Sequence, residues 1–181
     1  MIHYLTGDAT EPQVNKGARI IAHICNDLGG WGSGFVVALS NKWPEPERKY
    51  REWFKWATDD TNKTLPLGQI QLVQVKDPKK EGPLYVCNMI AQEGYTAPDH
   101  PVAVRYDMLC ACLADLNNWI GHYCHLKSRM VLPPTNTHLS IHMPRIGCGL
   151  GGGDWGIVSE LIGALLTACD VYVYDLEESN E

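Results

Sequence analysis

Runs of apolar residues alternate with segments of helical periodicity along most of the chain. The run RIIAHIC at 19–25 and the run LYVCNMIA at 84–91 are continuous, which is typical of strands buried on both faces of a sheet. Residues 68–75 instead alternate apolar and polar side chains, as a half-exposed strand does. We expect six strands, which in chain order are residues 2–6, 19–25, 68–75, 84–91, 138–143 and 170–176.

Four helices are expected between these strands. The clearest covers 101–120, with Pro101 in its first turn and one apolar face made of Val102, Tyr106, Leu109, Leu113, Leu116 and Ile120. The others cover 35–43, 45–57 and 155–169, and a turn is expected at 77–82. Buried strands that alternate with helices predict an α/β fold of three layers, in which helices cover both faces of a mixed, largely parallel sheet.

Composition limits the function more than the fold. The chain has 181 residues, 45% apolar and 20% charged, so we expect one domain over residues 1–176 and an acidic tail over 177–181. The net charge of −6 argues against direct binding of a nucleic acid, which normally contacts a basic face. It does not exclude a nucleotide, because backbone amides can hold phosphates without Lys or Arg.

The sequence carries no sign of a membrane segment, a leader or a metal centre. No stretch approaches the roughly 20 apolar residues of a membrane span, and MIHYLTGDATEP is not a signal peptide, so we expect a cytoplasmic protein. The seven cysteines include no CxxC pair and fit small buried hydrophobes. HYCH at 122–125 and the pair His138 and His142 lack the separated ligand pairs of a zinc site, so we predict no metal.

Two glycine-rich segments share one context. Residues 29–34 and 147–153 each follow a buried strand and precede a helix, where free N–H groups and the positive helix end converge. Two such loops on one domain fit a ligand with two phosphates, or with a phosphate and a sugar; the alternative is that both are only tight turns. No glycine stands in a GxxxxGK[ST] frame, and 30–34 has the wrong spacing for GxGxxG, which disfavours an NTPase and a dinucleotide oxidoreductase.

Four motifs in order resemble the signature of macro domains. They are GDAT at 7–10, AHICN at 22–26, GGWGSGF at 29–35 and MPRIGCGLGGGDW at 143–155. The similarity is closest to the branch with the ADP-ribose 1''-phosphate phosphatases and the terminal ADP-ribose protein glycohydrolase. It implies a three-layer α/β/α domain that binds ADP-ribose between the two glycine loops, with no cofactor.

The resemblance also implies the ligand-binding residues. Asp8 would accept a hydrogen bond from the adenine amino group, Asn26 would contact the distal ribose, and Tyr174 would cover the adenine. Local chemistry offers alternatives for all three, as a turn acid, a turn amide and a core aromatic. The full implied set is Asp8, Ala9, Asn26, Gly32, Ser33, Gly34, Phe35, Ile146, Gly147, Cys148, Gly149, Leu150 and Tyr174.

His23 and Asp154 are the candidate catalytic pair. Most macro domains have Asn where this chain has His23, and the phosphatase-like branch has His there; an imidazole beside the distal ribose could protonate a leaving oxygen near neutral pH. Asp154 on the facing loop could orient or deprotonate water. The alternatives are a core histidine and the N-cap of a helix. The lysine-dependent glycohydrolase mechanism is disfavoured, because no Lys lies between Lys80 and Lys127 and because Gly151 stands where those members have Asp.

The sequence thus favours an enzyme that hydrolyses ADP-ribose 1''-phosphate to ADP-ribose and phosphate. The alternatives are a reader that binds ADP-ribose, free or on a protein, without turnover, and a hydrolase that removes ADP-ribose from acidic side chains of proteins. The aromatic residues within 45–57 fit a packing face or a partner surface, and the sequence does not choose between them.

Overall fold

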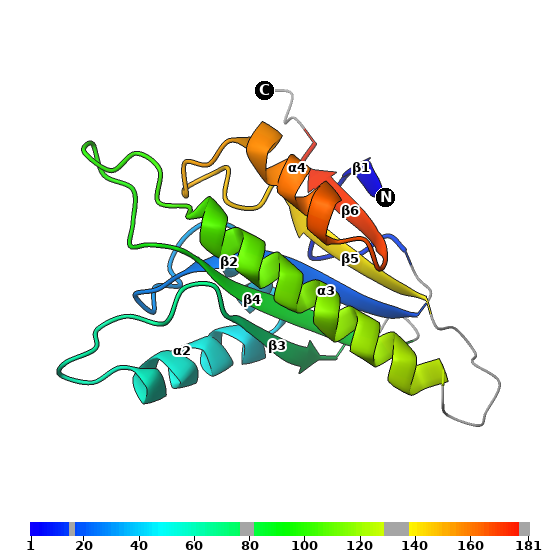
Figure 1. Cartoon of the computed structure of the whole chain (residues 1–181), viewed down its shortest axis with the longest axis horizontal. Coiled ribbons are helices and arrows are strands. Elements are labelled where there is room, and N and C mark those ends of the chain that lie inside the picture. Colours follow the sequence, from blue (N-terminus) through cyan, green and yellow to red (C-terminus); the bar gives the residue numbers. More distant parts are fainter. Residues whose placement is uncertain (15–16, 77–81, 129–137, 178–181) are drawn as a thin grey trace.

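A computed structural model describes residues 1–14, 17–76, 82–128 and 138–177 (Figure 1). Except for Gly82 and Glu177, the expected turn at 77–82 and the expected tail at 177–181 lie outside these residues. The elements in chain order are β1 (Ile2–Thr6), β2 (Ala18–Asn26), α1 (Phe35–Lys42), α2 (Glu45–Ala57), β3 (Ile70–Val75), β4 (Leu84–Gln92), α3 (Tyr106–Ser128), β5 (Leu139–Pro144), α4 (Trp155–Leu165) and β6 (Asp170–Asp175).

The six strands form one mixed sheet in the order β1-β6-β5-β2-β4-β3. All neighbours are parallel except β3 and β4, which pair antiparallel at one edge. β2 lies between β5 and β4, and the register places His23 of β2 beside Asn88 of β4. The continuous apolar runs therefore mark the interior strands, as expected for parallel strands covered on both faces.

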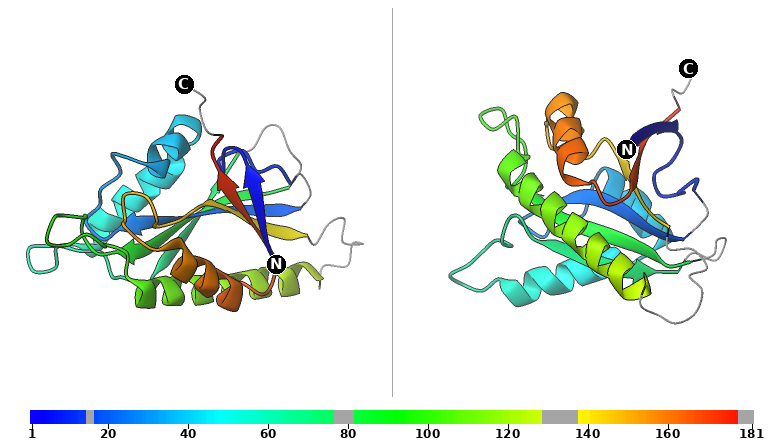
Figure 2. Two further views of the ribbon diagram at one scale, coloured as in Figure 1. Left: turned by 90° about the horizontal axis from the view of Figure 1, so that it is seen from above. Right: turned by 45° about the vertical axis from the view of Figure 1, so that its right-hand side comes forward.

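Helices cover both faces of this sheet, and the three-layer α/β expectation is confirmed (Figure 2). Successive side chains of a strand point to opposite faces. In β2, Ile20 and Ala22 pack in the core beneath α3 and α4, whereas Ile21 and Cys25 pack in the core beneath α1 and α2.

Two helices differ from their expected ranges. α3 begins at Tyr106 and not at Pro101, because Val104 forms an antiparallel bridge with Gln92 and holds the preceding segment extended; it then continues through HYCH to Ser128. α4 ends at Leu165, where the Asn117 side chain of α3 accepts hydrogen bonds from the backbone N–H groups of residues 167 and 168. A side chain from another element thus ends this helix before its apolar pattern does.

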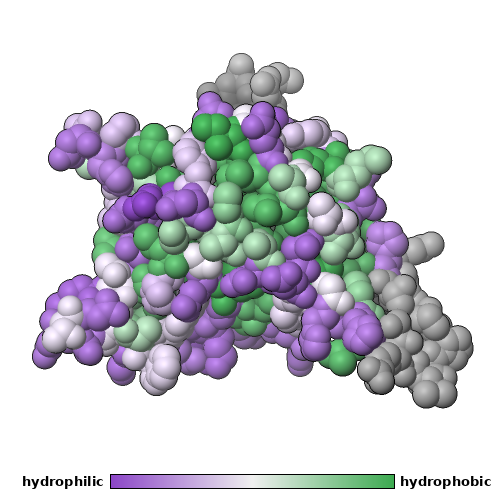
Figure 3. Space-filling model, in the orientation of Figure 1, coloured by the Kyte–Doolittle hydropathy of each residue, from purple (hydrophilic) through white to green (hydrophobic). Residues whose placement is uncertain are grey.

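The face that carries α3 and α4 shows apolar side chains gathered over α4, with polar ones around them (Figure 3). Within the described ranges, no helix has the length and apolar character needed to cross a bilayer.

Candidate functional site

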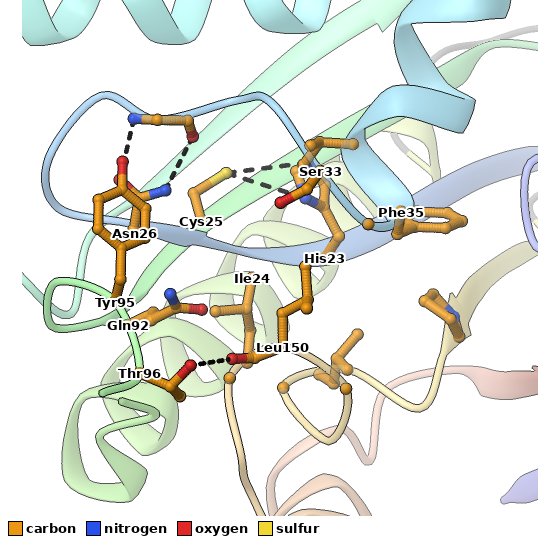
Figure 4. Close-up of a pocket in the computed structure, with 18 of the residues that line it drawn as sticks. His23, Ile24, Cys25, Asn26, Ser33, Phe35, Gln92, Tyr95, Thr96 and Leu150 are labelled. Carbon is orange, nitrogen blue, oxygen red and sulfur yellow. Dashed lines mark hydrogen bonds between the residues drawn. The ribbon is translucent and has the colours of Figure 1, made fainter. Parts of the chain in front are cut away.

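A cleft of about 580 Å³ opens where β5, β2 and β4 end (Figure 4). These neighbouring strands are parallel, so their carboxyl ends, Pro144, Asn26 and Gln92, meet at one edge of the sheet. Ligands of open α/β sheets bind in this position. The lining residues are His23, Ile24, Cys25, Asn26, Gly30, Gly32, Ser33, Gly34, Phe35, Val36, Gln92, Tyr95, Thr96, Pro144, Arg145, Ile146, Gly147, Gly149, Leu150 and Gly151.

The first glycine loop forms one wall of the cleft and leads into α1. Gly34 has a φ of +78°, a conformation that favours glycine, and it directly precedes the helix. Among the described residues, no acceptor pairs with the backbone N–H groups of Gly34, Phe35 and Val36. These donors and the positive end of α1 suit an anion.

The second glycine loop forms the opposite wall. It is closed on itself, because the N–H of Gly153 donates to the carbonyl of Gly147 and the N–H of Gly152 donates to the carbonyl of Gly149. The N–H groups of Gly149 and Leu150 have no acceptor within the part of the chain that is described. The two loops approach each other, since a Cβ built on Gly34 would lie 3.2 Å from Leu150 Cδ1.

Gly32 and Gly149, one in each loop, are glycines that the fold itself does not need. Neither has a positive φ, and a Cβ built on either meets no atom within 4 Å. Both line the cleft. A Cβ at these positions would therefore enter open space beside the cleft, where a ligand that contacts the backbone closely would require glycine.

The only cationic side chain among the residues that line the cleft is already neutralised. Arg145 forms two hydrogen bonds to the carboxylate of Asp175, at 2.6 and 2.7 Å, and its guanidinium lies over the rings of Tyr4 and Trp155. An anion in the cleft therefore meets backbone N–H groups and not an unpaired Lys or Arg.

His23 lies at the base of the cleft as a buried and neutral imidazole. Its Nε2 lies 2.6 Å from Asn88 Oδ1, and the ring packs edge-on against Trp31. The Asn88 amide nitrogen donates to Pro46 O and Gln71 Oε1, so Asn88 Oδ1 is the acceptor and His23 Nε2 carries the proton. Burial lowers the pKa of His23 from 6.5 to about 4, against the opposing effect of the hydrogen bond to Asn88.

With its pKa lowered to about 4, His23 is neutral near pH 7, and its one ring proton lies on Nε2, toward Asn88. Whether His23 acts in catalysis stays a prediction, and so does the catalytic role of Asp154. Asp154 caps α4, where Oδ1 accepts a hydrogen bond of 3.1 Å from the N–H of Ile157, and it does not line the cleft. Of the expected catalytic pair, His23 therefore lines the cleft and Asp154 lies outside its lining.

The ligand-binding residues expected from the sequence fall into two groups. Those brought together in the cleft are Asn26, Gly32, Ser33, Gly34, Phe35, Ile146, Gly147, Gly149 and Leu150. Those outside its lining are Asp8, Ala9, Cys148 and Tyr174. Whether these residues contact a ligand stays a prediction.

Asn26 lines the cleft but is also tied into the first loop. Its Oδ1 accepts hydrogen bonds from the N–H groups of Leu28 and Gly30, and its Nδ2 donates to the Gly30 carbonyl. The hydroxyl of Tyr50 donates to the Asn26 carbonyl at 2.6 Å. One amide hydrogen of Asn26 remains for a ligand.

Asp8 and Tyr174 lie beside the cleft, at the ends of β1 and β6. Asp8 Oδ1 accepts a hydrogen bond from the N–H of Thr10, and Lys42 Nζ lies 3.8 Å from Oδ2. Tyr174 is buried, and its hydroxyl accepts from the N–H of Gln13 and lies 2.8 Å from His142 Nδ1. Tyr174 therefore packs as a core aromatic, and its contact with the adenine stays a prediction.

Sequence reasoning missed three side chains at and after the end of β4. Gln92, the last residue of β4, and Tyr95 and Thr96, which follow it, line the cleft. The available signal was their position directly after a continuous apolar strand, since a parallel strand beside β2 ends at the same edge of the sheet. Within the described residues, no group of three or more His, Cys, Asp or Glu could hold a metal ion.

Comparisons with known proteins relate the whole chain to one family, although no family model matches it. The chain is 38% identical to the solved macrodomain protein of Streptomyces coelicolor, with 97% of this chain and 99% of that one covered and a TM-score of 0.70. It is 39% identical to a Bacteroides thetaiotaomicron protein of unknown function, with 97% and 98% covered and a TM-score of 0.78.

More distant relatives carry functional names. The chain is 30% identical over 164 residues to chromodomain-helicase-DNA-binding protein 1-like of Danio rerio, of which it spans only 14%. It is 23% identical to the ADP-ribose 1''-phosphate phosphatase of Candida albicans, with 86% of this chain and 87% of that protein covered. The structure of Thermosipho africanus DarTG in complex with ADP-ribose shares the fold at 17% identity, with 90% of this chain and 39% of that one covered and a TM-score of 0.60. On the strength of the full-length Streptomyces match, this chain belongs to the macrodomain family.

Proposed function

We propose that the protein binds ADP-ribose in the cleft, with the diphosphate held by the free N–H groups of both glycine loops. The observation that carries the proposal is the pair Gly32 and Gly149, which line the cleft although neither space nor backbone conformation requires glycine there. The solved complex of Thermosipho africanus DarTG with ADP-ribose, which shares the fold at 17% identity, supports the same ligand class.

In this proposal the distal ribose lies toward Asn26 and the adenine lies toward Asp8. Asp8 Oδ2 is not used by the Thr10 turn and would accept from the adenine amino group. Backbone donors would supply the contacts to phosphate, because the cleft-lining Arg145 is paired with Asp175.

The test places a larger side chain in each of the two glycine loops that form the walls of the cleft. Gly32→Val and Gly149→Val add side chains that meet no atom of the protein within 4 Å of Cβ, so each variant is expected to remain folded. Gly121→Val is the matched control, because Gly121 on α3 also has nothing within 4 Å of its built Cβ and is exposed. Titration calorimetry with ADP-ribose should show a loss of at least about tenfold in affinity for both cleft variants and none for Gly121→Val. Unchanged affinity in both cleft variants would exclude this pose.

We further propose that the protein is a hydrolase of ADP-ribose 1''-phosphate. Two relatives with that name match along most of their length, the Candida albicans protein and a Lodderomyces elongisporus protein that is 25% identical over 99% of its length. Water would attack phosphorus, and the bond between phosphorus and the 1''-oxygen would break to give ADP-ribose and inorganic phosphate.

Phosphate release from ADP-ribose 1''-phosphate, measured with a chelator present, tests this second proposal. Release by the native protein that is lost in Gly149→Val and retained in Gly121→Val supports the hydrolase. Binding of ADP-ribose without release supports the non-catalytic reader instead. Release of ADP-ribose from modified glutamate or aspartate side chains, but not of phosphate, supports the protein hydrolase.

A further inference from the structure

The turn after β4 joins the two glycine loops at one end of the cleft. The N–H of Gly94 donates to the buried carboxylate of Asp27, at 2.7 Å, on the side of the first loop. On the other side, the hydroxyl of Thr96 donates to the carbonyl of Leu150 at 3.2 Å (Figure 4). Tyr95 stands between these two attachments and lines the cleft.

The Tyr95 side chain reaches across to the first loop. A Cβ built on Gly30 would lie 2.0 Å from the Tyr95 hydroxyl oxygen, 3.0 Å from Tyr95 Cζ and 3.1 Å from Asn26 Nδ2. The phenol end of Tyr95 and the Asn26 amide therefore lie beside the same point of the backbone. Gly30 has no positive φ, so the space occupied by Tyr95 is what requires glycine there.

This arrangement puts an aromatic ring and a hydroxyl at the end of the cleft that the distal ribose would occupy. Tyr95 is 56% exposed, and its hydroxyl has no hydrogen-bond partner among the described residues. A sugar presents both apolar C–H faces and hydroxyl groups, and a tyrosine supplies an apolar face and a group that donates and accepts. In the proposed pose, ADP lacks the second sugar that would face this side chain.

We propose that Tyr95 is a specificity-determining residue that recognises the distal ribose and so distinguishes ADP-ribose from ADP. Gly30 acts with it, because any larger residue at position 30 would displace the phenol from the cleft. The inference rests on the proposed binding of ADP-ribose, and it assigns the preference for the second sugar to the segment after β4.

The experiment compares two ligands on matched variants. ADP-ribose and ADP are titrated into the native protein, Tyr95→Ala, Gly30→Ala and the control Trp56→Ala, which removes an aromatic side chain that is 86% exposed on α2. Tyr95→Ala is expected to lower the affinity for ADP-ribose about tenfold and to change the affinity for ADP less than twofold. Gly30→Ala is expected to do the same, because its methyl group meets the movable end of Tyr95, and to add no further loss when Tyr95 is already alanine.

Each outcome separates this inference from the proposed function. If the native protein binds neither ligand, the proposed function fails and the inference fails with it. If the native protein binds ADP-ribose but Tyr95→Ala weakens both ligands equally, or neither, the function stands and the inference is overturned. Melting curves of both variants show whether a loss reflects the site or the fold. Tyr95→Phe keeps the ring and removes the hydroxyl, so its affinity for ADP-ribose shows how much each of the two contributes.

Discussion

His23 donates a 2.6 Å hydrogen bond from Nε2 to the Oδ1 of Asn88, across the junction of β2 and β4. Asn88 is itself fully buried and is oriented by the two carbonyl oxygens to which its amide nitrogen donates. The pair therefore fixes one neutral tautomer of His23 beneath the first glycine loop. The imidazole also packs against the rings of Trp31 and Phe35.

The burial of His23 predicts that the protein loses stability in mild acid. The unfolded chain takes up a proton near pH 6.5, whereas the folded protein resists protonation until about pH 4. This contribution is fully present above pH 6.5 and is lost as the pH falls toward 4, with a size of about 3 kcal/mol. Urea unfolding of the native protein and of His23→Gln at pH 7.5 and at pH 5 measures the part lost by pH 5, about 2 kcal/mol, and the variant should show the smaller difference between the two pH values. His122→Gln, on the exposed surface of α3, is the control and should keep the full difference.

Asp154→Ala is expected to destabilise α4 without changing the rate of phosphate release. Removal of the N-cap should lower the free energy of unfolding by about 1 kcal/mol, while Asp154→Ser should restore most of that loss because Ser also caps. Phosphate release per folded molecule should be the same in both variants as in the native protein. If both variants stop releasing phosphate while they still bind ADP-ribose, Asp154 is catalytic after all.

Tyr174→Phe is expected to destabilise the protein by about 1–3 kcal/mol, because the buried hydroxyl is bonded both to the N–H of Gln13 and to His142. Tyr172→Phe on the same strand is the control, since Tyr172 stacks on His142 through its ring and that ring is kept. Denaturant midpoints of the two variants measure the difference. A larger loss in Tyr172→Phe than in Tyr174→Phe would contradict this account of the hydroxyl.

Asp8→Ala should abolish measurable binding of ADP-ribose, because the proposed pose gives its Oδ2 to the adenine amino group. Asp8→Asn keeps an oxygen acceptor and should retain part of the affinity. Calorimetry with ADP-ribose and with inosine diphosphate ribose, which lacks the amino group, provides the comparison. Equal affinity of the native protein for both ligands would remove Asp8 from the adenine site.

Sequence pattern predicted those parts of the fold that depend on local order. The apolar run at 19–25 became the central strand, and both glycine segments became the walls of the cleft, because a strand, a glycine loop and a helix follow each other directly in the chain. The residues alone did not decide whether the two glycine segments bind a ligand with phosphate groups or are only tight turns. The resemblance to macro domains supplied the ligand class.

Long-range packing decided what the sequence did not. The protonation state of His23 depends on Trp31, Asn88 and the rest of the core that covers it, and no local pattern reports that burial. Tyr95 enters the cleft only because β4 pairs with β2, which is a property of the sheet order. The helical spacing of apolar residues extends back to Val102 and so predicts a helix from Pro101. The bridge between Val104 and Gln92 keeps that segment extended instead.

The proposed phosphate site, which is made of neutral N–H groups, also determines how binding should respond to ionic strength. In a site built from lysines, added salt screens the attraction to phosphate and weakens binding. Here the one lining cation is paired with Asp175 and the chain carries a net charge of −6, so the long-range field repels an anionic ligand. Screening should therefore leave the affinity for ADP-ribose unchanged or raise it slightly between 50 mM and 500 mM salt, on the order of a factor of two at most.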